Sequence, residues 1–130
     1  MIVHDEIVST DFDSDNRSLE EACDMREELD SMVKEYNLID RTMDSFWLSY
    51  DNYLTDELTR EESKGLGLTD RSSVYIKLNG YSFHVSTSVD FDYISVKVYC
   101  YRKKENIPLI EYHCTYFLNG ELFDDYFYLA

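Results

Sequence analysis

The stretch SLEEACDMREELDSMVKEY, residues 18–36, organises the rest of the chain. Its apolar residues recur at intervals of three and four, a spacing that places them along one side of an α-helix. Ser18 and Glu21 form a capping box, because each side chain can accept a hydrogen bond from a backbone N–H that the first helical turn leaves unpaired. The apolar stripe consists of Leu19, Ala22, Met25, Leu29, Met32, Val33 and Tyr36.

The opposite side of this helix is acidic, with Arg26 and Lys34 as its basic residues. The whole chain has the same bias, with a formal charge of −15 over 130 residues. Residues 1–70 hold 20 acidic and 6 basic residues, a net charge of −14, whereas residues 71–130 hold 7 and 6, a net charge of −1. Because self-repulsion destabilises a fold, this concentration of charge predicts a positively charged partner, with a solvated surface as the alternative. The helix carries Glu20, Glu21, Asp24, Glu27, Glu28, Asp30 and Glu35.

A second helical pattern begins after Asn37 and covers residues 39–64. It ends at Lys64-Gly65-Leu66-Gly67, a basic last turn followed by glycine, which is typical of a helix C-terminus. Thr55-Asp56-Glu57 permits a kink near residues 52–55. Because the connection between the two helices is so short, we expect them to form an antiparallel hairpin.

Downstream of the helices, apolar and polar residues alternate, which is the period of a β-strand. The dipeptide Asn-Gly occurs at residues 79–80 and again at residues 119–120. Both copies predict tight hairpin turns, because Asn and Gly both accept positive φ angles. With a loop at residues 89–92 and a turn at 102–106, the pattern predicts five antiparallel strands within residues 73–129.

The predicted fold class is therefore α+β, with an N-terminal helical hairpin packed on one face of a five-stranded antiparallel β-meander. We expect a single domain, residues 1–130, made of an acidic leader (1–16), a helical part (17–66) and an antiparallel sheet (72–130). One face of the sheet is expected to take the helices, and the other to be polar and aromatic. The expected buried face holds Val74, Ile76, Phe83, Val85, Ile94, Val96 and Val98, and the expected open face holds Tyr75, Lys77, His84, Lys97, Tyr99 and Tyr101.

Composition limits the class of protein. A content of 44% hydrophobic and 15% aromatic residues excludes a disordered chain. No apolar run reaches the length of a membrane helix, and the start of the chain lacks a signal-peptide pattern, so we expect a protein of the host cell cytoplasm. Cys23, Cys100 and Cys114 are an odd number without C-x-x-C spacing, which predicts reduced thiols. Cys100 and Cys114 could face each other across neighbouring strands.

The leader has one pattern that resembles a metal site. Asp11, Asp13 and Asp15 match the D-x-D-x-D opening of a calcium loop. Such a loop needs glycine at its sixth position and glutamate at its twelfth, where this chain has Asn16 and Ala22. We therefore expect no metal site and no cofactor, and interpret the leader as a solvated segment beside the helix N-terminus.

The sequence offers little for catalysis. It has no nucleophile-elbow motif and no glycine-rich phosphate loop. A Cys114–His84 pair is the remaining catalytic alternative, which the sequence leaves open. We expect a protein that is not an enzyme.

Direct binding of nucleic acid is disfavoured by charge, because contacts to phosphate need Lys and Arg. The main basic cluster is the turn at residues 102–104. The aromatic face around Lys97 is the alternative, as a stacking platform for single strands.

The acidic residues themselves are the best guide to function. Seven carboxylates between Glu20 and Glu35 span roughly 22 Å of helix, about one per 3 Å. One DNA strand carries about one charge per 3.4 Å. The chain therefore predicts an inhibitor from a phage or mobile element, a DNA mimic of the anti-CRISPR or anti-restriction type, that binds a basic nucleic-acid-handling enzyme.

The alternatives are an immunity protein or antitoxin that neutralises a basic toxin, and a generic acidic interaction module. In each case the expected contact is with protein, by charge complementarity, and not with nucleic acid or membrane. The predicted partner-binding residues are Glu20, Asp24, Glu27, Glu28, Asp30, Glu35, Asp44, Asp51 and Asp56.

Overall fold

The computed structural model describes the backbone of residues 6–9, 19–88 and 90–130, and the side chains from residue 25 onward within those ranges. The predicted α+β class, with helices followed by an antiparallel sheet, is confirmed. All strand pairs are antiparallel, in the order β1-β2-β3-β4-β5. The elements are β1 (Glu6–Ser9), α1 (Leu19–Glu35), α2 (Leu38–Thr55), α3 (Arg60–Gly65), a 3-10 turn η1 (Arg71–Ser73), β2 (Val74–Val85), β3 (Tyr93–Arg102), β4 (Ile110–Phe117) and β5 (Leu122–Leu129).

The predicted count of five strands within residues 73–129 is wrong, because this region forms four. Asn79-Gly80 does not turn the chain; it lies inside β2, where the pairing shifts from Leu78↔Val98 to Gly80↔Lys97. This is a β-bulge, in which two residues of one strand oppose one residue of its neighbour. The extra residue keeps the apolar positions before and after it on the same face of the sheet. The remaining strand of the sheet, β1, pairs with the second half of β2.

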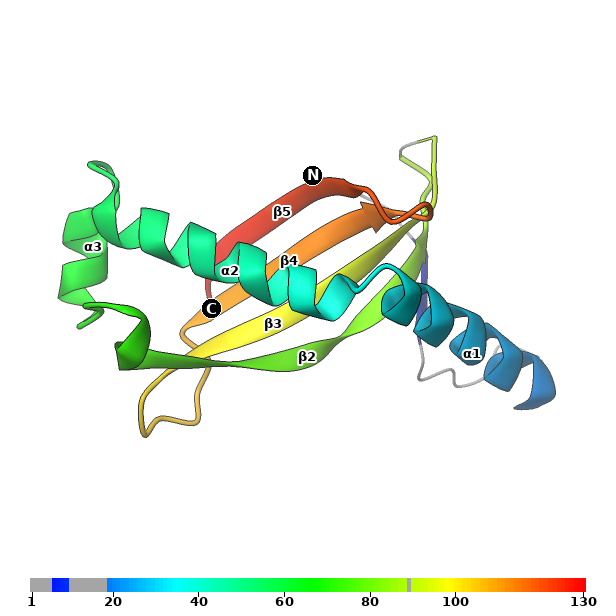
Figure 1. The fold of residues 1–130 in the computed structure, drawn as a ribbon, viewed down its shortest axis with the longest axis horizontal. Coiled ribbons are helices and arrows are strands. Elements are labelled where there is room, and N and C mark those ends of the chain that lie inside the picture. The colour runs from blue at the N-terminus through cyan, green and yellow to red at the C-terminus, as the bar shows by residue number, and fades with distance from the viewer. Residues whose placement is uncertain (1–5, 10–18, 89) are drawn as a thin grey trace.

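The predicted helical hairpin is not confirmed. Asn37, between α1 and α2, has a left-handed conformation (φ 55°, ψ 42°). In Figure 1, α1 extends away from the start of α2 instead of folding back beside it. The two helices therefore follow each other nearly end to end over the sheet and beyond it.

The predicted helix over residues 39–64 is divided in two. α2 ends at Thr55, and the backbone N–H of Leu58 then bonds to the Asp56 carboxylate. The Thr59 hydroxyl donates to the carbonyl of Tyr53. These side-chain bonds offer the backbone an alternative to the helix, so α2 stops and α3 begins as a separate short helix.

The core lies between α2 and one face of the sheet, which α2 crosses in Figure 1. Phe46 of α2 is fully buried and contacts the rings of Tyr112 and Phe127, with centroids 5.7 and 6.1 Å away. Of the predicted buried face, Val74, Ile94, Val96 and Val98 are buried, Ile76 and Phe83 pack against the core, and Val85 is half-buried. Within the described ranges, no helix combines the length and apolar character needed to cross a membrane.

The two cysteines that the structure describes with side chains, Cys100 and Cys114, are free and buried. They do not face each other, because Cys100 pairs with Ile110 and Cys114 with Val96. Cys114 points toward the helices, whereas His84 lies on the other face of the sheet, stacked on Tyr93. The sheet therefore separates the two members of the catalytic pair that the sequence had left open.

We expect Cys100 to resist alkylation by iodoacetamide at pH 8 while the chain is folded. Burial raises the pKa of its thiol to about 12, so the reactive thiolate is roughly a thousandfold scarcer than for a thiol of pKa about 9. Peptide mass spectrometry after a short labelling pulse, with and without urea, measures this protection. Rapid labelling of Cys100 in native buffer would show that the core between α2 and β3 is open.

Candidate acidic interaction surface

α1 has one side buried against the sheet, and predicted partner-binding residues lie exposed on its other sides. Leu29 and Val33 are buried on the sheet side of the helix, with 4% and 3% exposure. Glu27, Glu28 and Glu35 are exposed on its other sides. Glu20 and Asp24 belong to the same helix, but their side chains lie outside the described residues, as do Asp11, Asp13 and Asp15.

Asp30 has a structural contact. Its carboxylate accepts a hydrogen bond from the hydroxyl of Tyr81 on β2. The pKa of Tyr81 rises to about 12, first because its ring is buried and second because of this bond. Asp30 therefore joins α1 to β2, and it is half-buried rather than fully free for a partner.

On α2, one side is buried and the other is acidic. Phe46 and Tyr50 are fully buried, whereas Asp40 and Asp44 are exposed one turn apart. Asp40 was not among the residues predicted from sequence, although it lies four residues before Asp44, on the same side of α2, and in the first turn of that helix. Asp40 also lines a groove of about 420 Å³ where α1 meets α2, together with Asp30 and Lys34.

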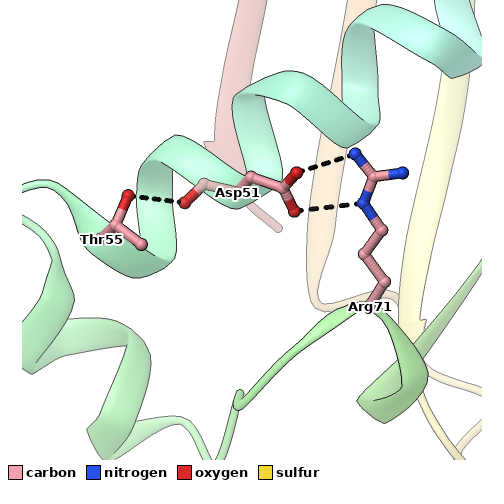
Figure 2. Close-up of polar contacts among 3 residues, drawn as sticks. All are labelled: Asp51, Thr55 and Arg71. Carbon is pink, nitrogen blue, oxygen red and sulfur yellow. Dashed lines mark hydrogen bonds and ion pairs between the residues drawn. The ribbon is translucent and has the colours of Figure 1, made fainter.

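Asp51 is already paired within the chain. Figure 2 shows both carboxylate oxygens facing the guanidinium of Arg71, with N–O distances of 2.7 and 3.1 Å. The hydrogen bond from Arg71 lowers the pKa of the Asp51 carboxyl. The Thr55 hydroxyl donates to the carbonyl of Asp51, one turn earlier in α2, at 3.0 Å. Arg71 also lies over the Trp47 ring, 5.4 Å from its centroid, so Asp51 anchors the end of α2 to η1.

Asp56 is exposed but also holds local structure. It follows α2 and accepts the N–H of Leu58 in the turn before α3. Its carboxylate therefore stands about a full helix length from those of α1. The structure does not bring it together with them.

Among the described side chains of α1 and α2, five exposed carboxylates follow one another along the two helices, and we call them the acidic ridge. Two exposed cations, Arg26 and Lys34, lie on the same helices. The half-buried Arg41 points inward, donating to the carbonyls of Tyr36 and Gly120 at 3.2 and 2.8 Å. The acidic ridge consists of Glu27, Glu28, Glu35, Asp40 and Asp44.

The other face of the sheet differs in character. Figure 1 shows α2 in front of the strands, with α1 and α3 beyond its two ends, and no helix is drawn behind the strands. There, Tyr75 and Tyr101 stack with ring centroids 5.0 Å apart, and the Lys77 ammonium lies 5.7 and 5.6 Å from those centroids. Lys97 pairs with Glu111 at 3.7 Å. The molecule is therefore polarised, with acid on the helical side and aromatic rings on the open sheet face.

The part of the chain with described side chains was examined for residues that could hold a metal ion. It contains no group of three or more His, Cys, Asp or Glu residues placed to hold an ion. The leader that resembles a calcium loop lies outside the described residues, so the expectation that it binds no calcium stays a prediction.

Comparison of the chain with protein-family models, curated proteins and solved structures found no match in any of the three.

Proposed function

We propose that this protein is a small non-enzymatic inhibitor that binds a basic nucleic-acid-handling protein in the place of nucleic acid. The observation that carries the proposal is the acidic ridge, because its exposed carboxylates follow one another along two nearly end-to-end helices. A groove lined by Lys and Arg for a phosphate backbone would find negative charge over a comparable length here.

The length and spacing of the ridge define what it can imitate. From Glu27 to Asp44 the helices run about 25 Å at 1.5 Å per residue. Five carboxylates over that length give about one per 5 Å, compared with one phosphate per 3.4 Å of a DNA strand. The negative charges of the ridge are therefore more widely spaced than those of DNA. Over the same length a DNA strand carries about seven phosphates, compared with five carboxylates here.

Three contacts hold the ridge in place. Arg41 ties the end of α1 to the β4–β5 turn, Asp30 bonds to Tyr81 of β2, and Asp51 pairs with Arg71 at the other end of α2. A surface that is ordered before binding loses less conformational entropy when a partner docks. This rigidity favours a defined interface over a loosely solvated acidic surface.

Nucleases of restriction and CRISPR systems have the required chemistry, since they hold nucleic acid in positively charged channels. We propose that the chain is encoded by a phage or mobile element and acts against such an enzyme in the host cytoplasm. Genes of phage or defence systems beside this one would support that source. An adjacent toxin gene would instead favour an immunity protein.

The experiment is capture of the partner. The tagged protein is incubated with lysate at low salt, and bound proteins are eluted by a rising salt gradient and identified by mass spectrometry. We expect a basic nucleic-acid-binding protein that elutes early in the gradient, because contacts between exposed charges are screened by salt. A partner that is not basic, or whose binding is insensitive to salt, would contradict the proposal.

A further inference from the structure

We propose that the free edge of β5 binds an extended, basic segment of a partner protein by adding it to the sheet as a further strand. β5 (Leu122–Leu129) is the last strand of the sheet and pairs with β4 alone among the described strands. This contact uses a different surface from the acidic ridge, and the inference does not depend on the function proposed above.

The backbone of β5 is oriented for such pairing. The N–H of Ala130 donates to the carbonyl of Leu109 at 2.8 Å, in line with the Ile110↔Leu129 register. Because hydrogen-bonded and non-bonded pairs alternate in an antiparallel ladder, the amides of Asp125, Phe127 and Leu129 point away from β4. The N–H of Asp125 bonds instead to the carboxylate of Asp124 at 2.8 Å, where the carbonyl of an added strand would lie.

Little in the strand itself blocks this edge. β5 has eight residues, whereas the strand at the other edge, β1, has four. It contains no proline and no lysine, which protect many edges, although Asp124 and Asp125 are charged and the Asp124 carboxylate occupies one outward N–H. A bulge opposite Thr115 and Tyr116 distorts only its start. Tyr128 and Leu129 are 42% and 45% exposed, so apolar side-chain surface lies beside the unpaired backbone groups of β5.

Charge selects a basic strand rather than a second copy of this chain. The charged residues of β5 are Asp124 and Asp125, both exposed. Two copies would each bring a net charge of −15, so edge-to-edge pairing between them is repulsive. The Asp125 carboxylate already accepts the Tyr112 hydroxyl at 2.7 Å, so a strand with Lys or Arg would meet chiefly Asp124 with the opposite sign.

The aromatic rings beside the edge also favour cations. Tyr126 and Tyr128 stack along β5 with centroids 6.3 Å apart, and His113 of β4 lies 4.6 Å from Tyr126. Tyrosine faces attract ammonium and guanidinium groups. The contact of Lys77 with Tyr75 and Tyr101 shows the same interaction elsewhere on this sheet face.

An apolar site lies at the start of β5. Phe123 packs against Phe91 and Phe117, with ring centroids 5.0 and 5.4 Å away. Next to them is a shallow pocket of about 460 Å³ lined by Phe91, Asp92, Phe117, Leu118, Asn119 and Glu121. This pocket lies on the β3–β4 side of β5, so the added segment is expected to place its basic residues against Asp124 and the tyrosines and not to enter the pocket.

The test uses a fluorescein-labelled peptide of alternating Lys and Val, matched to β5 in length, and fluorescence anisotropy. A peptide of equal charge with Pro in place of alternate Val residues is the control for charge alone, because Pro cannot supply the ladder N–H groups. We expect the Pro peptide to bind at least roughly tenfold more weakly, because it loses the free energy of one to two backbone hydrogen bonds.

The matched protein variants are Leu129→Pro and Leu129→Ala. The N–H of Leu129 points away from β4, so Pro removes no bond within the sheet, yet it blocks the edge. We expect Leu129→Pro to weaken binding of the Lys-Val peptide roughly tenfold, and Leu129→Ala to weaken it much less.

Amide hydrogen exchange of the wild-type protein locates the contact directly and covers the case in which Leu129→Pro does not fold. On addition of the Lys-Val peptide, the amides of Asp125, Phe127 and Leu129 should gain protection. Protection confined to α1 and α2, equal binding of the Lys-Val and Pro peptides, or dimers of the free protein paired through β5 in sedimentation would each overturn the proposal.

Discussion

Gly120→Ala is expected to lower the free energy of unfolding by about 2–4 kcal/mol, a large part of the 5–15 kcal/mol typical of a small domain. Gly120 has φ of +89° in the β4–β5 turn, a conformation that costs an L-residue about 1–2 kcal/mol. An added Cβ would also lie 2.5 Å from Cγ and Cδ1 of Tyr36, at the base of a ring that packs against the core. Urea unfolding of the wild type and the variant measures the difference.

Gly67→Ala is the matched control for the backbone term. Gly67 has a similar φ of +78°, but no atom lies within 4 Å of the position its Cβ would occupy. We expect this variant to lose only about 1–2 kcal/mol. Equal losses for Gly120→Ala and Gly67→Ala would mean that Tyr36 does not pack against the turn as described.

Reversing four charges of the acidic ridge is expected to weaken partner binding by roughly tenfold to a thousandfold. The variant combines Glu27→Lys, Glu28→Lys, Asp40→Lys and Asp44→Lys. Each exposed contact is worth roughly 0.2–1 kcal/mol and desolvated ones more, so four losses amount to about 1–4 kcal/mol. The fold should remain intact, because these side chains are exposed and their mutual repulsion falls. Surface plasmon resonance with the captured partner gives both rates, and the loss should lie largely in the association rate.

A control must separate the effect of the ridge carboxylates on binding from the effect of the net charge of the protein. Asp40→Lys with Asp44→Lys is compared with Glu57→Lys and Asp90→Lys, which change the net charge equally at exposed positions outside the ridge. The first pair should weaken binding and the second should have little effect. Tyr75→Ala with Tyr99→Ala tests the open sheet face in the same assay. If the Tyr75→Ala, Tyr99→Ala variant does not bind the partner while the charge-reversed protein binds normally, the ridge is only a solvated surface.

The two Asn-Gly dipeptides explain how far local sequence predicts this fold. Asn119-Gly120 lies in a hairpin turn as predicted, closed by bonds between Phe117 and Glu121 and between Gly120 and Phe117. The turn is longer than the predicted Asn-Gly turn, and of the two residues only Gly120 has a positive φ. Asn79-Gly80 has the same local preference but becomes a bulge, because β3 pairs with the chain on both sides of it. The outcome depends on a neighbouring strand that comes later in the sequence, so the dipeptide alone does not determine it.

The helices show the same limit. Apolar spacing predicted α1 to within a residue at each end and the start of α2 to within one residue. It did not predict that Asn37 would join the helices end to end, since a two-residue connection permits either arrangement. It also did not predict that Asp51 would find Arg71 twenty residues later, or that Asp30 would bond to Tyr81. Of the predicted carboxylates on α1 and α2, the structure shows Glu27, Glu28, Glu35 and Asp44 exposed, whereas Asp30 and Asp51 are half-buried and paired. Whether any of them binds a partner stays a prediction.

Competition with DNA tests the central claim most directly. The captured partner is loaded with fluorescent duplex DNA, and this protein is titrated in at constant salt. If the acidic ridge occupies the nucleic-acid groove, the fluorescent DNA is displaced in full, a higher concentration of the same fluorescent DNA reverses the effect, and no ternary complex forms in sedimentation. The charge-reversed variant should fail to displace it. A stable complex that contains the partner, DNA and this protein together would contradict the account.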